Sequence, residues 1–554
     1  MIKKDKTFLE LIFVTIIFFV FLIILSPSGL GEYFTEETWK SWGASRILLS
    51  KGEFVQNSLG PLYYLFLIIL SPFDYKNSII IEYFFTHIFF MVCVYFLFLK
   101  FDKKFLGVLF SIFLITYIAF IQSPKYVLAP GFLILHFANH RKSYFGQWFP
   151  PFLFISFLCN WGYVVFFIGH LLGKFFFHFK NKNLQLAKPN LITIILSIIL
   201  ICPIILKADK FYNNHFVSFY DLKYSPIALK SPLEIGFFQI GNYKKARNDY
   251  AAEDLYKADW YLTHNNFYGD CKTLTCILKN KPKIIVEEIF NDPGYNLRIL
   301  TSLIFNKEVV VLKKVYFIPF LLLFALIVLV GSFNILRKNR DNYILIFCLF
   351  LGTLGYLLAL SLTTFSYRYS FPLFPVFIIL LLNANIKIPN ISKKYANTNF
   401  FLVFVLLIQL IFNVKDYIIK FDNKEFYKTR DIEVTKKKTT NYFKSEKSVF
   451  KYINSNQKIL TTDPNWLRGF SQADPKKIYS QYALPPVDNE DTSKFLNTFD
   501  IILLKYNVEI AEPSIGTQSY LRYKLHLKDY LIASKDKWLR KEIKNYGNIY
   551  IKKN

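Results

Sequence analysis

The sequence predicts a polytopic α-helical membrane protein, with about eleven transmembrane helices and a small C-terminal extracytoplasmic α/β domain. Hydrophobic residues make up 53% of the 554 residues, including 62 Phe and 37 Tyr, which is more apolar surface than one soluble core can hide. These residues form uninterrupted blocks, as membrane spans require. Lys and Arg gather in the short segments between blocks, which is typical of cytoplasmic loops.

The first apolar block runs from Thr7 to Leu25, after a basic start that contains Lys3, Lys4 and Lys6. About 20 apolar residues cross a bilayer, so this block is long enough for one span. A cleaved signal peptide shares the basic start and the apolar middle. The length of the block, its lack of a clear small-x-small cleavage site and the spans that follow favour a retained helix. The lysines place the N-terminus in the cytoplasm and the next loop outside.

Further candidate spans follow, and several of them are short enough to be re-entrant or to be extended by buried polar residues. They are Ile79 to Leu99, Phe105 to Ile121, Val127 to Ala138, Phe149 to Leu158, Tyr163 to Phe177, Leu191 to Leu206, Val315 to Leu336, Tyr343 to Leu362, Ser370 to Leu382 and Phe400 to Val414. Threaded from an inside start, this order puts the short basic loops on the inner side. The net charge of +28 therefore serves mainly to orient helices, and nucleic acid is not an expected partner.

This topology divides the chain into a transmembrane domain, residues 1–414, and an extracytoplasmic α/β domain, residues 415–554. Two loops of the first domain, about 28–78 and 207–314, also lie outside. The outer segments are rich in lysine, but long domains translocate largely regardless of charge. In the C-terminal segment, strand-like runs begin at Lys458, Phe499 and Asn548, with polar, turn-rich stretches between them.

Cysteine usage agrees with this sidedness. Cys93, Cys159, Cys202 and Cys348 lie in or at the edge of apolar blocks, where a thiol behaves as a small hydrophobe. Cys271 and Cys276 lie together in the second outer loop, and their spacing predicts a disulfide in an oxidising compartment. Free thiols and a metal site are the alternatives; His264 is the only nearby residue that would complete such a site.

An acidic pair, Glu36-Glu37, follows the first block by a few residues. Two carboxylates at a membrane surface suggest chemistry, because adjacent acids repel and one can acquire a raised pKa suited to proton transfer. The alternative is a purely structural role, in which two solvated acids begin an interfacial helix and interact favourably with its dipole.

Two stretches of the chain form recognisable motifs. The first consists of Thr35-Glu36-Glu37-Thr38-Trp39, a run that begins at Ala44, Lys51-Gly52, and Gly60-Pro61-Leu62-Tyr63-Tyr64; the second runs from Tyr367 to Pro375. The first resembles the first outer loop of GT-C glycosyltransferases, the superfamily of protein O-mannosyltransferases and lipid A aminoarabinose transferases, and the second is similar to their Arg-Tyr-x-x-Pro-x-x-Pro segment. The chain departs from the pattern at Glu36, where Asp is more usual, at Ser58-Leu59-Gly60, and around Ser123-Pro124-Lys125-Tyr126, where some members have an acid. Metal dependence and subfamily stay open.

The resemblance implies transfer of a sugar from a polyprenyl-phosphate donor to a lipid, glycan or protein acceptor on the outer face, by inverting displacement. A general base must lie within hydrogen-bond reach of the acceptor, and Glu36 is the predicted base. Glu37 would orient it, hold a metal or bind the acceptor. No cofactor is certain; a divalent metal ion is possible, at Glu36 or Glu37.

Positive charge must meet the departing phosphate, and a guanidinium can bind two phosphate oxygens at once. Arg368 beside Tyr369 is the first candidate, while Lys125 and Arg46 are secondary ones. Trp39, Trp42, Tyr63 and Tyr64 are candidates for stacking on sugar or lipid. Ordinary anchoring of these cations and aromatic rings in the lipid headgroup region is the alternative in each case.

Other chemistries lack local support, since the sequence contains no Walker loop, Gly-x-Ser-x-Gly elbow or His-Glu-x-x-His run. His136, His140, His170 and His178 are read as packing or interface residues. Two alternative functions remain: a glycan polymerase or ligase with a diphosphate-linked donor, and a non-catalytic transporter or flippase. The expected location is the inner (plasma) membrane of a bacterium, in contact with membrane lipids.

Overall fold

The fold is taken from a computed structural model, and it combines a bundle of apolar helices with a C-terminal mixed β-sheet. The structure describes residues 2–25, 36–51, 59–73, 75–115, 126–139, 150–180, 268–269, 271, 273–290, 329–335, 337, 342–361, 373–384, 448–461, 467–468, 471–474, 477–480, 494, 496–505, 528–544 and 546–553. The expected spans at Leu191 to Leu206 and Phe400 to Val414 lie outside these residues.

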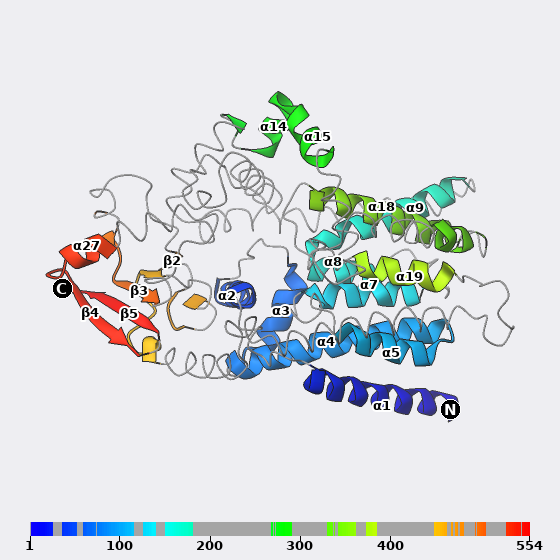
Figure 1. Cartoon of the computed structure of the whole chain (residues 1–554), viewed down its shortest axis with the longest axis horizontal. Coiled ribbons are helices and arrows are strands. Elements are labelled where there is room, and N and C mark those ends of the chain that lie inside the picture. Colours follow the sequence, from blue (N-terminus) through cyan, green and yellow to red (C-terminus); the bar gives the residue numbers. More distant parts are fainter. Residues whose placement is uncertain are drawn as a thin grey trace, which may run out of the picture.

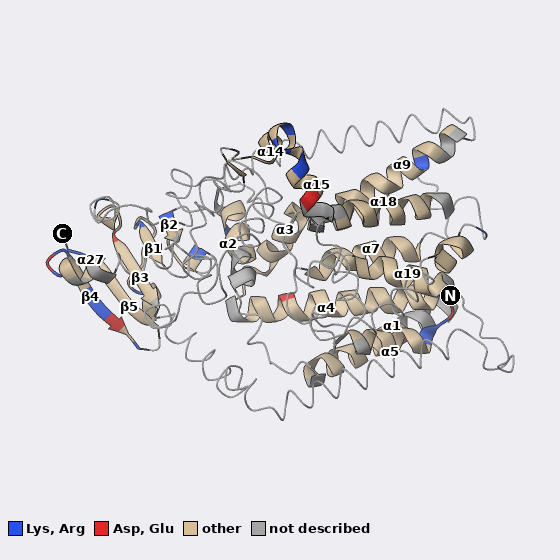
Figure 2. Ribbon diagram, turned by 45° about the horizontal axis from the view of Figure 1, so that its top comes forward, with Lys and Arg blue, Asp and Glu red and all other residues tan. Residues whose placement is uncertain are grey.

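The bundle contains eight apolar helices of the described part of the chain, drawn in Figure 1. They are α1 (Ile2–Leu25), α4 (Tyr75–Lys100), α5 (Lys104–Ile115), α7 (Leu128–Ala138), α8 (Pro151–Cys159), α9 (Val164–Lys180), α18 (Asn342–Ser361) and α19 (Phe374–Ala384). Their buried side chains form one continuous hydrophobic core. Figure 2 shows few charged residues along these helices, whereas strand β4 (Trp538–Ile543) of the C-terminal sheet carries both basic and acidic residues.

Among the described residues, one helix, Asn77–Lys100, is long and apolar enough to cross a bilayer by itself. Shorter apolar helices are Leu9–Ile23, Pro61–Leu70, Leu128–Ala138, Trp161–Phe176, Ile344–Leu357 and Phe374–Asn383. The number of about eleven spans therefore stays a prediction.

The segment predicted as the first outer loop contains two helices, α2 (Glu36–Lys51) and α3 (Pro61–Leu70). Pro61 occupies the first turn of α3, where its missing N–H costs nothing. Gly60 precedes it and donates a 2.9 Å backbone hydrogen bond to Cys159 at the end of α8. A Cβ on Gly60 would lie 2.0 Å from the Leu158 carbonyl oxygen, so only glycine permits this approach. The glycine in this motif thus joins α3 to the bundle.

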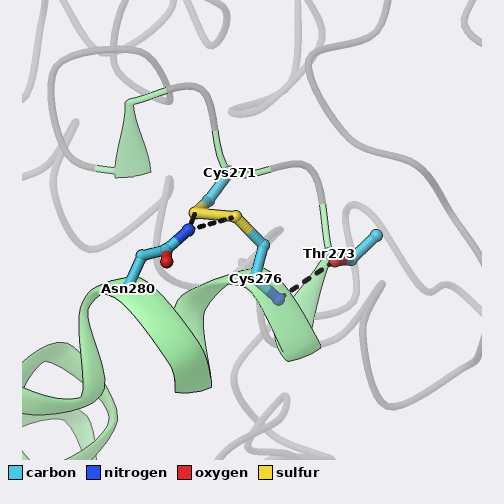
Figure 3. The surroundings of a disulfide bond; sticks show 4 residues. All are labelled: Cys271, Thr273, Cys276 and Asn280. Carbon is cyan, nitrogen blue, oxygen red and sulfur yellow. Dashed lines mark hydrogen bonds between the residues drawn. A yellow bond between two sulfur atoms is a disulfide. The ribbon is translucent and has the colours of Figure 1, made fainter.

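In the segment predicted as the second outer loop, the structure describes α14 (Leu274–Asn280) and α15 (Pro282–Phe290). Cys271 and Cys276 are joined by a disulfide at the start of α14 (Figure 3). The hydroxyl of Thr273 accepts a hydrogen bond from the Cys276 N–H, which caps the helix. The bridge therefore closes a short loop that leads directly into α14.

The C-terminal domain is built on a five-stranded sheet in the order β2-β1-β3-β5-β4. Its strands are β1 (Ile459–Thr461), β2 (Ile478–Ser480), β3 (Ile501–Lys505), β4 (Trp538–Ile543) and β5 (Gly547–Lys552). β1 pairs in parallel with β2 and β3, while β5 pairs antiparallel with β3 and β4. The expected strand-like runs coincide with β1, β3 and β5. β2 has three residues, and β4 exposes its charged central residues, so neither has a strong apolar pattern.

Both faces of this sheet are covered, because alternate residues of each strand point to opposite sides. Ile501 and Leu503 of β3 join one core, with Val449 and Ile453, and Ile502 and Leu504 join the other. Leu531 of α27 (Lys528–Ala533) packs in that second core. The sheet therefore has its own two-sided core.

The N-terminus and the C-terminal sheet lie at opposite ends of the molecule in Figure 1, and α2 lies between the bundle and the sheet. This position of α2 sets the geometry of the candidate site.

Candidate functional site at helix α2

Helix α2 is fixed to the bundle through a buried carboxylate on α4. Trp42 of α2 donates its indole N–H to Glu82 Oε2 over 2.9 Å. The Tyr63 hydroxyl of α3 donates to the other oxygen, Oε1, over 2.5 Å. Glu82 is only 1% exposed, and both of its oxygens accept hydrogen bonds, as a buried carboxylate requires. One acid therefore ties α2 and α3 to the long helix α4.

The opposite contact of α2 is with the C-terminal domain. Arg46 donates from its two terminal nitrogens to the backbone carbonyls of Arg468, over 3.3 Å, and Ala473, over 3.2 Å. Burial lowers the pKa of Arg46, and the charge of Asp474 opposes that shift. Because an arginine pKa starts far above neutrality, the guanidinium stays protonated and forms charge-assisted hydrogen bonds.

The loop that contains Arg468 and Ala473 is itself held to the sheet by the buried side chain of Arg468. Arg468 is 3% exposed and donates to the carbonyl of Ile478 on β2 over 2.6 Å. Burial lowers its pKa to about 10, so it too is charged at neutral pH. Arg46 thus docks on a loop that is anchored to the sheet.

The predicted catalytic pair begins α2. The helix starts at Glu36, so Glu36 and Glu37 occupy its first turn, where the helix dipole favours negative charge. Glu36 precedes Trp42 by six residues, or about 9 Å of helix rise. For Glu36, Glu37 and Trp39 the structure describes the helical backbone alone. Lys125, Arg368 and Tyr369 lie outside the described residues, so their predicted roles stay predictions.

The remaining predicted substrate residues have intramolecular partners. Arg46, proposed from sequence as a secondary phosphate ligand, directs its guanidinium to two backbone carbonyls. It also lies ten residues after Glu36, about 15 Å along the helix. Tyr63, Tyr64 and Trp42 are buried, with exposed fractions of 0%, 1% and 4%, and present no face on which a sugar can stack. Packing and hydrogen bonding account for these four residues.

Sequence reasoning missed Glu82, which accepts hydrogen bonds from both α2 and α3. It lies inside the apolar block predicted from Ile79 to Leu99, and the block was read for its hydrophobicity alone. A lone acid in such a block is costly unless it has partners, and it commonly marks a functional site. That signal was present in the sequence, whereas its partners, Trp42 and Tyr63, are known only from the fold.

A second group of chemically active side chains lies within the bundle. His136, His170 and Cys348 come from α7, α9 and α18, and their candidate ligand atoms all lie within 4.8 Å of one another. All three are buried. Sequence reasoning treated the two histidines as packing or interface residues and Cys348 as a buried hydrophobe. The structure instead brings together three residues of types that bind transition metals.

Comparison with known proteins adds no family to this description: no protein-family model matches the chain, and no curated protein matches it.

Proposed function

We propose that this protein is a membrane glycosyltransferase that transfers a sugar from a polyprenyl-phosphate donor to an acceptor on the extracytoplasmic face. The main support is the position of α2. This helix begins with the acidic pair and is held on one side by Glu82 of the apolar bundle and on the other by the C-terminal domain. A lipid-linked donor brings its phosphate to such a boundary, while its tail stays among apolar helices.

In the proposed reaction, Glu36 accepts the proton of the acceptor group as that group attacks the anomeric carbon of the sugar. The bond to the polyprenyl phosphate breaks on the opposite side, and configuration inverts. Arg368 stabilises the negative charge that develops on the leaving phosphate. Glu37 orients Glu36 or binds the acceptor.

Within this proposal, Glu82 is a positioning residue that acts through α2. A general base must be held in a narrow range of positions, and effective catalytic groups are supported by partners that fix their orientation. Trp42 lies less than two turns after Glu36, so its hydrogen bond to Glu82 limits the movement of the first turns of α2. The Arg46 contacts limit the other end.

The disulfide at Cys271 and Cys276 supports the proposed sidedness, since such bridges persist in oxidising compartments. The basic N-terminus and the C-terminal sheet lie at opposite ends of the molecule (Figure 1), as the proposed placement of these two parts on opposite sides of the membrane requires. The proposed location is therefore an inner (plasma) membrane, with the N-terminus in the cytoplasm and the sheet outside.

The deciding experiment supplies membranes containing the protein with a panel of polyprenyl-phosphate sugars and follows donor consumption by mass spectrometry. We expect one sugar class to be consumed by the wild type and not by Glu36→Gln. Glu10→Gln is the matched control. Glu10 lies on α1 and accepts hydrogen bonds from Tyr95 and Lys104, neither of which belongs to α2. Normal consumption by a well-folded Glu36→Gln variant would refute the base assignment.

The same assay separates the alternatives. A polymerase or ligase would use diphosphate-linked and not monophosphate-linked donors, and a flippase would move the lipid across the bilayer with no glycosidic bond broken. For the phosphate role, Arg368→Ala should lose donor use and Arg368→Lys should retain part of it. Equal activity in both variants and the wild type would contradict that role.

A further inference from the structure

The group formed by His136, His170 and Cys348 lies at the meeting point of three bundle helices. His136 is in the last turn of α7, His170 in the second turn of α9, and Cys348 in the second turn of α18. Their exposed fractions are 5%, 1% and 0%. The imidazole rings lie edge to face, with centroids 4.8 Å apart. Two imidazoles and a thiol thus share one apolar compartment.

Glycines on α9 bring the cysteine to the histidines. A Cβ at Gly169 would lie 3.3 Å from the Cys348 Cα, and one at Gly173 would lie 2.8 Å from the Phe347 Cβ. On α18, a Cβ at Gly352 would lie 2.1 Å from the ring of Phe166. Helices α9 and α18 therefore approach more closely than side chains would ordinarily allow. This approach brings Cys348 close to His170 of the neighbouring helix, with their candidate ligand atoms within 4.8 Å of each other.

The geometry points to a metal site: we propose that His136, His170 and Cys348 bind one soft transition-metal ion, and that this ion is Cu(I) in preference to Zn(II). Imidazole and thiolate are ligands that both ions accept. This proposal stands independently of the glycosyltransferase assignment.

Charge decides between the two ions. A thiolate with two neutral imidazoles makes a neutral complex with Cu(I) and a cationic one with Zn(II). The site lies in an apolar interior, where net charge is costly. Lys174 follows His170 by one turn on α9 and is 1% exposed, so it adds a buried ammonium beside the site. A second net positive charge there would be unfavourable, and the neutral Cu(I) complex avoids it.

The distances require a small contraction on binding. Metal bonds of about 2.0 Å to nitrogen and 2.3 Å to sulfur hold ligand atoms roughly 3.5 to 4 Å apart. In the structure the candidate ligand atoms lie within 4.8 Å of one another, so side-chain movements of about 1 Å bring them to the distances that a bound ion requires. The Cys348 thiol donates to the Phe166 carbonyl over 3.3 Å in the structure. On binding, the thiol releases its proton to solvent buffer and the thiolate binds the metal.

The test uses the full-length protein in detergent, freed of metal by chelation and kept anaerobic with ascorbate. Cu(I) is supplied as its bicinchoninate complex, and loss of the coloured complex reports capture by the protein. We expect about one Cu(I) per chain in the wild type and at least about 10-fold weaker capture in Cys348→Ser and His170→Ala. Cys93→Ser and Cys159→Ser are matched controls, because both replace buried thiols outside the group.

Copper X-ray absorption of the loaded wild type provides a second measurement that needs no variant. We expect one sulfur and two nitrogen neighbours. Capture that is equal in Cys348→Ser and the wild type, or absorption with no sulfur neighbour, would overturn the proposal. Binding of one Zn(II) per chain with no capture of Cu(I) would overturn the choice of ion. Binding of neither ion would refute the metal site and leave the three residues a packing cluster.

Discussion

The hydroxyl of Tyr63 donates a 2.5 Å hydrogen bond to the carboxylate of Glu82, and this bond joins the short helix α3 to the long apolar helix α4. The same carboxylate accepts from Trp42 of α2. Three elements that are separate in sequence therefore meet at one buried acid. The arrangement makes Glu82 and its two donors the structural support of the proposed active site.

Removal of the Tyr63 hydroxyl should destabilise the protein measurably. Tyr63→Phe keeps the ring in the core but takes one donor from a buried carboxylate, which costs about 1.5–3 kcal/mol in comparable cases. Tyr95→Phe is the matched control: Tyr95 donates to Glu10 over 2.6 Å, but that carboxylate is 31% exposed and keeps Lys104 as a partner. Unfolding in detergent should show a smaller loss for Tyr95→Phe. Equal losses would contradict the importance of burial at Glu82.

Loss of the Trp42 donor should loosen α2 without disturbing the sheet. Trp42→Phe retains an aromatic ring but removes the hydrogen bond to Glu82. We expect faster amide hydrogen exchange along α2 and unchanged exchange in β3 and β5, measured by mass spectrometry. Trp161→Phe, which alters a ring packed on Phe157 of α8, is the control. Unchanged exchange in α2 would mean that packing alone holds this helix.

Arg46 should control the docking of the C-terminal domain on α2. Arg46→Ala leaves the carbonyls of Arg468 and Ala473 without this donor, so we expect faster hydrogen exchange at residues 467–474 and in α2. Arg46→Lys should restore slow exchange only in part, because one ammonium cannot reproduce the two hydrogen bonds that the planar guanidinium donates to separate carbonyls. Arg540→Ala, whose partner Asn548 lies within the sheet, should leave α2 unaffected. If Arg46→Lys exchanges as slowly as the wild type, the positive charge alone, and not the guanidinium geometry, holds the C-terminal domain on α2.

The proposed base should be sensitive to charge more than to side-chain length. Glu36→Gln should lower the rate of sugar transfer by roughly 10²- to 10⁴-fold, the usual contribution of a general base. Glu36→Asp keeps the carboxylate and should retain measurable activity, and Glu37→Gln should lose less than Glu36→Gln. Initial rates at saturating donor check this order. A larger loss in Glu37→Gln would transfer the role of base to Glu37.

Alkylation should distinguish the disulfide from the buried thiols. The chain has six cysteines, and Cys271 and Cys276 are bonded to each other. After denaturation without reductant, mass spectrometry should find alkylation at Cys93, Cys159, Cys202 and Cys348 only. Reductant should add Cys271 and Cys276. Alkylation of all six cysteines without reductant would place the loop in a reducing compartment and contradict the proposed topology.

The sequence by itself determined the features that depend on local pattern. Continuous apolar blocks indicate where helices lie. The runs at Ile459, Ile501 and Asn548 indicate strands, because their apolar residues pack into the two cores of the sheet. The short spacing of Cys271 and Cys276 also predicted their bridge, since two cysteines so close along the chain pair readily in an oxidising compartment. The residues that depart from such a pattern, such as those of β4, were not predicted.

Tertiary structure decided which residues act together. Glu82, Trp42 and Tyr63 lie on three helices, and so do His136, His170 and Cys348; no sequence spacing relates the members of either group. Local periodicity shows that a helix has an apolar face but not which other helix packs on it. That choice depends on close packing over long sequence separations, such as the approach of Gly169 to Cys348. The partners of a buried acid or thiol are therefore a property of the fold.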